Sequence, residues 1–234
     1  MTGSVALVTG ATKGIGRAIS LALADDGWRV GVCARTAADV DDFVQVLESR
    51  GNGAAGCPAD VGDPDDVRAL VERVESRLGP VDLLVNNAGV AIIKPFSELD
   101  LDEWDRTMST NLRSMFLVTG AVLPGMRRRG SGTIINIASL AGRNGIVGGT
   151  AYTASKHAVL GFSRSLMLEV RKDGVRVIAI CPGSVDTPLI HNSFGGKDPD
   201  RILKPEDVAA TVLNVMHLPP RAMVSELDIR PTNP

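Results

Sequence analysis

The chain of 234 residues has a net charge of −2, with 44% hydrophobic and 22% charged residues, a balance that supports a large buried core and excludes a disordered protein. The one basic run, residues 127–129, is more typical of the polar end of a helix than of a nucleic-acid surface, so we expect no nucleic-acid partner. No apolar run approaches the roughly 18 residues of a membrane span and no basic leader precedes the first apolar run, so we expect no membrane partner and a cytoplasmic location.

Strands and helices are predicted to alternate along the chain. The first apolar run, residues 5–8, is typical of a strand buried on both faces, and a glycine turn and apolar residues at helical spacing follow it as far as Leu23. Further strands are predicted at residues 29–33, 54–59, 81–86, 133–138, 175–181 and 224–229. Further helices are predicted at residues 39–50, 64–78, 102–129, 152–172 and 205–217.

This alternation predicts an α/β protein with a Rossmann fold, a doubly wound parallel sheet of about seven strands flanked by helices. No linker or charge block divides the chain, so a single domain is predicted for residues 1–234. The three cysteines, Cys33, Cys57 and Cys181, are widely spaced and odd in number. Their pattern favours reduced thiols over a disulfide framework or a zinc site, and no metal is expected.

A glycine-rich turn follows the first predicted strand. Its spacing, Gly10-x-x-x-Gly14-x-Gly16, differs from the common G-x-G-x-x-G pattern, and Ile15 directly after Gly14 excludes a P-loop. In a doubly wound sheet, ligands bind beyond the carboxyl ends of the strands, and amides at the start of the next helix can face an anionic diphosphate. By itself, the turn is compatible with a phosphate site or with a purely structural role.

Residues 139–156 contain a serine, the only tyrosine of the chain and a lysine four residues after that tyrosine. If Tyr152 and Lys156 lie on one helix, their Cβ atoms are about 5–6 Å apart on the same face. An unperturbed tyrosine has a pKa near ~10, and a neighbouring ammonium favours the phenolate and lowers that pKa. The pattern predicts a proton-exchanging tyrosine, although isolated pairs of this kind also occur on protein surfaces.

Taken together, these residues resemble the short-chain dehydrogenase/reductase (SDR) family over nearly the whole chain. The family's landmarks occur in its order and at predicted strand ends: the TGATKGIG turn at residues 9–16, Asp60, Asn-Asn-Ala-Gly at residues 86–89, Asn111, Ser139 with Tyr152 and Lys156, and Pro182-Gly183. The resemblance implies an NADP-preferring oxidoreductase, similar to 3-oxoacyl reductases. Its expected reaction is hydride transfer between nicotinamide and a carbonyl or secondary alcohol.

The resemblance also implies a role for each landmark. Tyr152 would be the general acid or base, and Ser139 would hydrogen-bond the reacting oxygen. Lys156 would hold the nicotinamide ribose hydroxyls and, together with the positive oxidised nicotinamide, lower the pKa of the tyrosine. Asn111 would bend its helix and help anchor a water that passes protons to Lys156. Cofactor contacts are expected from Gly10, Thr12, Lys13, Gly14, Ile15, Gly16, Arg35, Asp60, Val61, Asn87, Ala88, Gly89, Tyr152, Lys156, Pro182, Gly183, Val185 and Thr187.

Several of these residues have a structural alternative. Ser139 could be a turn or capping residue, Asn111 a solvent-facing helix residue, and residues 86–89 a strand-ending turn, because Asn and Gly both tolerate positive φ.

The choice between NAD and NADP depends on the end of the second predicted strand. An acidic residue there would bind the ribose 2′-hydroxyl of NAD and repel a 2′-phosphate. This chain has Ala34-Arg35 instead, and Lys13 in the glycine turn supplies a second cation. In similar family members, basic residues at these two positions clamp the 2′-phosphate, so NADP(H) is predicted. Arg35 as a solvated surface residue is the alternative.

Residues 184–204 lack clear periodicity and contain Gly195-Gly196 and Asp198-Pro199, a pattern typical of a mobile lid. In the family, this region covers the substrate, and Val185 and Thr187 touch the nicotinamide carboxamide. The apolar residues Leu189, Ile190 and Phe194 suggest a partly apolar substrate or packing on the protein body. His191 is either a specificity residue or an exposed loop residue.

The substrate class stays open at this point. The resemblance favours a small-molecule ketone such as a 3-oxoacyl thioester, with hydroxy acids, sugars and steroids as alternatives. An NAD-linked alcohol dehydrogenase and a non-catalytic NADP-binding regulator are rival functions. A homotetramer or homodimer is also implied, because in the family the helices around Asn111 and Tyr152 pack against a second copy. The small residues Ala151, Ala154, Ala158 and Gly161 would permit that contact.

Overall fold

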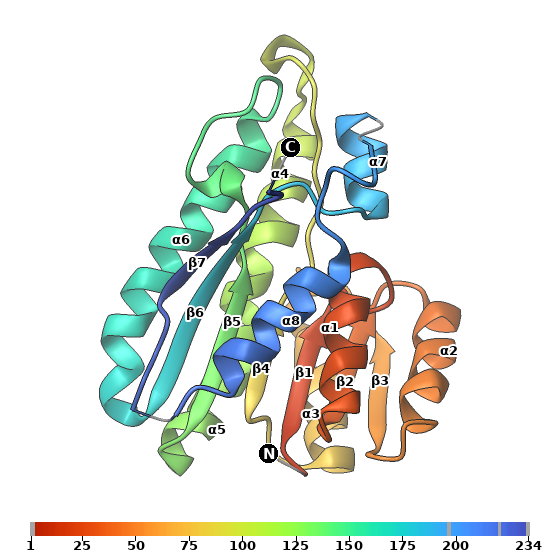
Figure 1. Cartoon of the computed structure of the whole chain (residues 1–234), viewed down its shortest axis with the longest axis vertical. Coiled ribbons are helices and arrows are strands. Elements are labelled where there is room, and N and C mark those ends of the chain that lie inside the picture. Colours follow the sequence, from red (N-terminus) through yellow and green to blue (C-terminus); the bar gives the residue numbers. More distant parts are fainter. Residues whose placement is uncertain (1–2, 196–197, 220, 233–234) are drawn as a thin grey trace.

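A computed structural model describes residues 3–195, 198–219 and 221–232. They form one parallel sheet with the strand order β3-β2-β1-β4-β5-β6-β7 (Figure 1). The strands are β1 (Val5–Thr9), β2 (Arg29–Ala34), β3 (Ala54–Pro58), β4 (Leu83–Asn86), β5 (Gly132–Ile137), β6 (Val175–Pro182) and β7 (Glu226–Ile229). The prediction of a doubly wound Rossmann-type sheet is confirmed.

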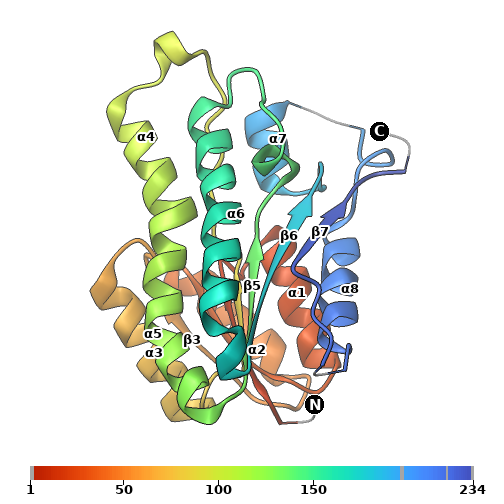
Figure 2. The same ribbon diagram turned by 90° about the vertical axis from the view of Figure 1, so that its left-hand side faces the viewer.

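Helices cover both faces of this sheet (Figures 1 and 2). They are α1 (Gly14–Asp25), α2 (Ala37–Glu48), α3 (Pro64–Leu78), α4 (Leu101–Met108), α5 (Ser114–Arg129), α6 (Thr150–Val170), α7 (Pro188–Phe194) and α8 (Pro205–Met216). Apolar residues of α1, α2 and α8 form one core with alternate strand residues. Those of α3, α5 and α6 form a second core on the opposite face. Strand β1 is fully buried because it lies between the two cores.

The strand order reverses between β1 and β4. The chain runs outward from β1 through β2 to β3 and then returns to the other side of β1 with β4. The loops after these two strands therefore diverge to opposite faces and leave a crevice at their carboxyl ends, where ligands bind in sheets of this kind.

The long helix predicted at residues 102–129 is divided into α4 and α5. A π-helical turn at Ser109–Arg113 separates them, and the buried Asn111 lies within it. The Asp100 carboxylate caps α4 by accepting a hydrogen bond from the Glu103 amide, and the Glu103 carboxylate accepts one from the Asp100 amide. Apolar periodicity did not reveal the division because a single π turn shifts the helical register by only one residue.

Two strands start later than predicted. Strand β4 begins at Leu83 rather than at residue 81, and the Asp82 side chain just before it accepts the Val5 amide. Strand β7 begins at Glu226 rather than at residue 224. Its pairing with β6 starts at Glu226, which lies opposite Ala179.

The predicted lid contains a helix that the sequence pattern missed. Thr187 caps α7 by accepting the Ile190 amide, and Pro188 occupies the first helical position. Seven residues are too few to show a helical period. Residues 196–197, which include Gly196 of the predicted lid, lie outside the described residues. Within the described part of the chain, no helix is long and apolar enough to cross a membrane, and no cluster of His, Cys, Asp and Glu could hold a metal ion.

The turn between α6 and β6 provides a test of this packing. Gly174 has φ +74°, and a Cβ there would overlap the Gly130 carbonyl oxygen, whereas Gly130 has φ +65° with open space around its Cβ position. We expect Gly130→Ala to cost about 1 kcal/mol from left-handed strain and Gly174→Ala at least about 1 kcal/mol more from the added overlap. Urea unfolding measures both, and equal losses would contradict the close approach.

Candidate active site

A cavity of about 840 Å³ opens at the carboxyl ends of the strands. Its lining comes from the glycine turn, the ends of β2 and β3, the loop after β4, the end of β5, α6, the end of β6 and the lid. The volume lies within the range of small-molecule and cofactor sites, about 300–1,000 Å³. The cavity therefore occupies the crevice that the reversal of strand order predicts.

The glycine turn is closely packed against the loop after β4. Gly10 and Gly14 have φ +63° and +53°, and a Cβ on Gly10 would lie 2.9 Å from the Ala88 Cα. A Cβ on Gly16 would overlap the Asn87 side-chain amide, so only glycine fits there. Lys13 precedes α1 without a side-chain cap, which leaves the first amides of α1 available to an anion.

Two polar side chains fasten these two loops together. The Thr9 hydroxyl accepts the Asn87 and Ala88 amides at 3.0 and 3.1 Å. The Asn87 side chain donates to the Thr9 and Gly10 carbonyls at 2.9 and 3.1 Å. The turn after β1 and the loop after β4 therefore form one rigid wall of the cavity.

Tyr152 and Lys156 lie on the same face of α6, as their spacing predicts. They are 7% and 5% exposed, and the Lys156 Nζ is 5.8 Å from the Tyr152 ring centroid. Lys156 donates to the Ile137 carbonyl at 3.0 Å, which fastens α6 to the end of β5. Ser139 follows β5, accepts the Ala141 amide at 3.1 Å and hydrogen-bonds with the Tyr152 side chain.

Burial sets the protonation of this pair. It raises the pKa of Tyr152, and the hydrogen bond with Ser139 opposes that rise. It lowers the pKa of Lys156 from 10.5 to about 8. The lowering of the Tyr152 pKa that was expected with the oxidised cofactor bound stays a prediction. In this structure, burial has the largest effect on the Tyr152 pKa, and the Lys156 ammonium bonds to the Ile137 carbonyl. The phenol holds its proton at neutral pH.

Asn111 lies behind the cavity rather than in its wall. Its side-chain amide donates to the Val90 carbonyl at 2.9 Å and to the Ser155 hydroxyl at 3.0 Å, and its oxygen accepts the Val90 amide at 2.8 Å. A Cβ on Gly89 would lie 3.3 Å from that oxygen and 3.8 Å from the Lys156 Nζ. The absence of a side chain at Gly89 thus lets Asn111 and Lys156 approach the same point.

Every residue for which a site role was predicted lines the cavity except Gly16 and Asn111. Gly16 packs behind the turn, and Asn111 contacts the site through Val90 and Gly89. Residues that sequence reasoning missed also line the cavity, namely Thr36 just before α2 and Asp39 on it, Arg106 and Thr110 near the π turn, and the apolar Val90, Leu140 and Ile146. Of these residues, Asp39 could most easily have been predicted from the sequence, because it follows Arg35 closely and lies in the first turn of a predicted helix.

The predicted lid contacts the end of the cavity where Tyr152 lies. The Phe194 ring meets Tyr152 edge to face, with 6.0 Å between the centroids. Ser193 donates to the Ala91 carbonyl at 2.7 Å. His191, which the sequence left as a specificity or loop residue, lies on α7 and pairs with Asp186 at 2.7 Å. The Asp186 carboxylate also accepts Lys204 at 3.0 Å.

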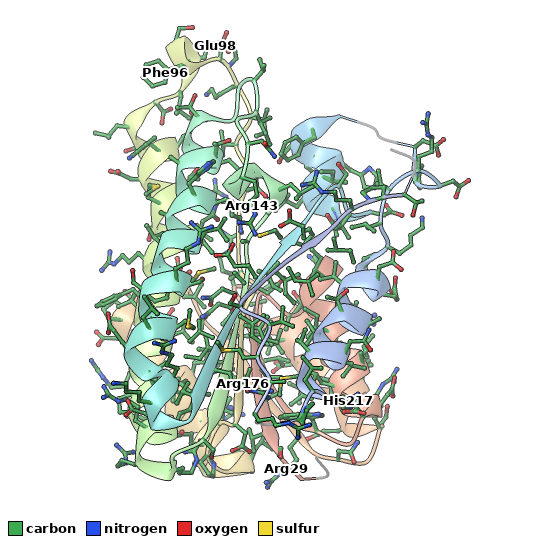
Figure 3. The ribbon with its side chains drawn as sticks, turned by 60° about the vertical axis from the view of Figure 1, so that its left-hand side comes forward. Arg29, Phe96, Glu98, Arg143, Arg176 and His217 are labelled. Carbon is green, nitrogen blue, oxygen red and sulfur yellow. The ribbon has the colours of Figure 1, made fainter. Side chains whose placement is uncertain are left out.

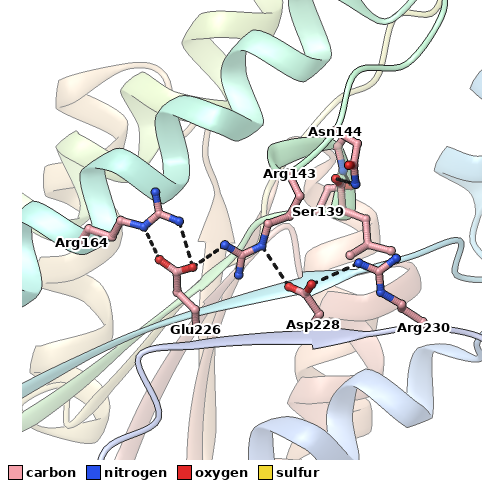
Figure 4. A network of polar contacts seen from close by, with 9 residues as sticks. Ser139, Arg143, Asn144, Arg164, Glu226, Asp228 and Arg230 are labelled. Atoms are coloured by element: carbon pink, nitrogen blue, oxygen red, sulfur yellow. Dashed lines mark hydrogen bonds and ion pairs between the residues drawn. The ribbon is translucent and has the colours of Figure 1, made fainter.

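An ion-pair network supports the loop that carries Ser139 (Figure 4). Arg143 pairs with Glu226 and, at 3.1 Å, with Asp228 on the edge strand β7, and Arg164 of α6 contacts Glu226 at 3.0 Å. Figure 3 shows Arg143 between α6 and β7, far from Phe96 and Glu98 at the end of the molecule. The network therefore connects the Ser139 loop, α6 and the sheet edge.

Comparisons with known proteins agree with this geometry. A family model described as short chain dehydrogenase matches residues 4–197. A Streptomyces virginiae protein described as a ketoacyl reductase of the monensin polyketide synthase is 46% identical over 190 residues, which cover 80% of this chain and 73% of that protein. The chain belongs to the short chain dehydrogenase family. It is an oxidoreductase.

Solved structures show the same fold. The actinorhodin polyketide ketoreductase, solved as a variant with NADPH, matches with a TM-score of 0.90 and 36% identity over 97% of this chain and 96% of that one. An alcohol dehydrogenase from the archaeon Thermococcus sibiricus, complexed with 5-hydroxy-NADP, matches with a TM-score of 0.91 and 30% identity over 99% of this chain and 97% of that one.

Glu226 provides a test of the network. Its hydrogen bonds with Arg164 and then Arg143 lower its pKa below the ordinary 4.5, so its ion pairs stabilise the fold above pH 4.5 and are lost as the pH falls through the lower folded value. We expect Glu226→Gln to lower the free energy of unfolding by about 1 kcal/mol at pH 7, with a smaller loss at acid pH. Urea unfolding at several pH values measures this. Glu169→Gln, at an exposed position of α6, is the control, and an equal loss there would contradict the role of the network.

Proposed function

We propose that this protein is an NADP(H)-dependent carbonyl reductase in which Tyr152 exchanges the proton with the reacting oxygen. The observation that carries the proposal is the meeting of Ser139, Tyr152 and Lys156 at one end of a cavity whose other end is the glycine turn. A regulator that only senses the cofactor has no need of a buried proton donor, which disfavours that rival.

The cavity fits a nicotinamide dinucleotide from one end to the other. Gly10, Gly14 and the first amides of α1 suit the diphosphate, and Gly16 keeps the turn tight. Asp60, Val61 and residues 87–89 line the cavity and would hold the adenosine half, and Pro182, Gly183, Val185 and Thr187 line it and would hold the nicotinamide. Lys13 and Arg35 would bind a 2′-phosphate and so favour NADP over NAD. The solved relatives named above, with NADPH and 5-hydroxy-NADP, agree with that choice.

A bound nicotinamide cofactor supplies the hydride, and the residues of this chain manage the oxygen. Ser139 donates a hydrogen bond to the carbonyl oxygen and orients it towards Tyr152. Because burial keeps Tyr152 protonated, the phenol gives its proton as negative charge develops on that oxygen. Lys156 stabilises the resulting phenolate, and its pKa of about 8 suits it to pass on a proton in turn. Asn111 holds the loop at Val90 through two hydrogen bonds to the Val90 backbone.

The wall around Tyr152 indicates an apolar substrate next to the reacting carbonyl. Val90, Ile146, Leu189, Ile190 and Phe194 line the cavity, and the Phe194 ring packs against Tyr152 itself. Relatives described as ketoacyl reductases support a 3-oxoacyl thioester as the first substrate to test. The described residues 184–195 and 198–204 act as its lid. The alternative of an NAD-linked alcohol dehydrogenase is disfavoured by Lys13 and Arg35.

Tyr152→Phe tests the mechanism. We expect kcat to fall by about 10³-fold or more, because a phenyl ring has no proton to donate, while the affinity for NADPH stays within about twofold. A panel of ketones that includes a 3-oxoacyl thioester, assayed by NADPH consumption and repeated with NADH, measures activity, and NADPH fluorescence measures binding. Retention of most activity in the variant would remove Tyr152 from the reaction.

A homodimer or homotetramer is part of the same proposal. Phe116 of α5 and Leu168 of α6 are 65% and 57% exposed, and the Cβ positions of Gly120 and Gly161 on the same two helices face open space. These helices lie side by side (Figure 2), so they offer an apolar surface with room for close approach. The cytoplasmic location stays a prediction.

Phe116→Glu tests this surface. Burying a carboxylate between two copies is costly, so we expect the variant to shift the assembly towards smaller species in light scattering at micromolar concentration. Leu101→Glu is the matched control, because Leu101 is 71% exposed at the start of α4, away from the two glycines. A monomeric unchanged protein would contradict the assembly.

A further inference from the structure

An acidic side chain lies among the two cations at the adenosine end of the cavity. Asp39, in the first turn of α2, lines the cavity together with Lys13 and Arg35. The Lys13 Nζ is 2.9 Å from an Asp39 carboxylate oxygen. The Lys13 and Asp39 side chains are 67% and 35% exposed, so this ion pair lies at the open mouth of the cavity.

Arg35 differs from Lys13 in this respect. It is exposed at the cavity wall, and among residues 3–195, 198–219 and 221–232 it has no ion-pair partner. Thr36 next to it is the N-cap residue before α2 and makes no side-chain capping bond, so its hydroxyl is available to a ligand. The two cations therefore differ in how far their charge is compensated. Arg35 lines the cavity without an acidic partner in the described part of the chain, whereas the charge of Lys13 is compensated by Asp39.

We propose, on the basis of the function proposed above, that Asp39 is a specificity-determining residue that limits the preference of this enzyme for cofactors with a 2′-phosphate. A 2′-phosphate next to Arg35 competes with Asp39 for the Lys13 ammonium, and it is also repelled by the Asp39 carboxylate. A ribose 2′-hydroxyl has no charge to be repelled and can donate a hydrogen bond to a carboxylate.

In this arrangement, different residues attract and repel the 2′-phosphate. Lys13 and Arg35 supply the attraction for the 2′-phosphate, and Asp39 reduces that attraction without removing it. The affinity for a cofactor that lacks the phosphate depends little on either cation. Asp39 therefore acts on the ratio of the two affinities rather than on the affinity for the shared part of the cofactor.

Binding of the half-cofactors 2′,5′-ADP and 5′-AMP tests the role of Asp39 without any catalytic step. We expect Asp39→Asn to bind 2′,5′-ADP about five- to tenfold more tightly than the unchanged protein, because one nearby negative charge is lost and Lys13 is freed. The affinity for 5′-AMP should stay within about twofold or fall. Isothermal titration calorimetry at low salt measures both dissociation constants.

Two control variants and a salt series sharpen the result. Asp42→Asn removes the same charge from an exposed position of α2 that does not line the cavity, and it should leave the ratio unchanged. Asp39→Glu keeps the charge and should stay close to the unchanged protein. The gain of Asp39→Asn should shrink at high salt, since exposed charges are screened, whereas a structural effect on α2 would persist.

The outcomes separate this inference from the proposed function. If the unchanged protein prefers 2′,5′-ADP and Asp39→Asn leaves the ratio unaltered, the inference on Asp39 is overturned and the NADP(H) preference stands. If the unchanged protein binds both half-cofactors equally, the NADP(H) preference fails, and a rise in the ratio in Asp39→Asn still supports the inference. An equal gain in Asp42→Asn overturns it, because a general charge effect then explains the change.

Discussion

The site depends on the close approach of the glycine turn to the loop after β4. No side chain fits between them at Gly10 or Gly16, and the Thr9 hydroxyl and Asn87 amide close the remaining space with hydrogen bonds. This contact lies between β1 and β4, where the strand order reverses, and it fixes the position of one wall of the cavity. A substitution here affects the fold and the cofactor site together.

The catalytic end is built from elements that are rigid for separate reasons. Lys156 fastens α6 to β5 through the Ile137 carbonyl, the π turn places Asn111 against the Val90 backbone, and the ion pairs of Arg143 hold the Ser139 loop to β7. Proton transfer needs the donor and the acceptor in a fixed geometry, and each of these contacts restricts the movement of one element of the site. The lid completes this end through Phe194, which touches Tyr152 itself.

The two ends of the cavity use charge differently. At the catalytic end, burial keeps the phenol neutral and brings the pKa of Lys156 to about 8, so protonation follows from the loss of water. At the adenosine end, the charges are exposed and act on each other across the mouth, as the pair of Lys13 and Asp39 does. Burial of Tyr152 and Lys156 suits proton exchange, whereas exposed charges such as Lys13 and Asp39 shift the relative affinities for two ligands by modest amounts.

The sequence by itself determined the alternating elements, the sheet class, the glycine turn and the spacing of Tyr152 and Lys156, because these follow from local periodicity and from residue types with few conformational options. The tertiary structure decided what depends on distant neighbours. Burial raises the pKa of Tyr152, the π turn divides a helix that the apolar pattern predicts as continuous, and α7 forms in a segment too short to show a period. The pairing of Lys13 with Asp39 also arose only in space, since 26 positions of chain separate the two residues and only the fold brings β1 and α2 together at the cavity mouth.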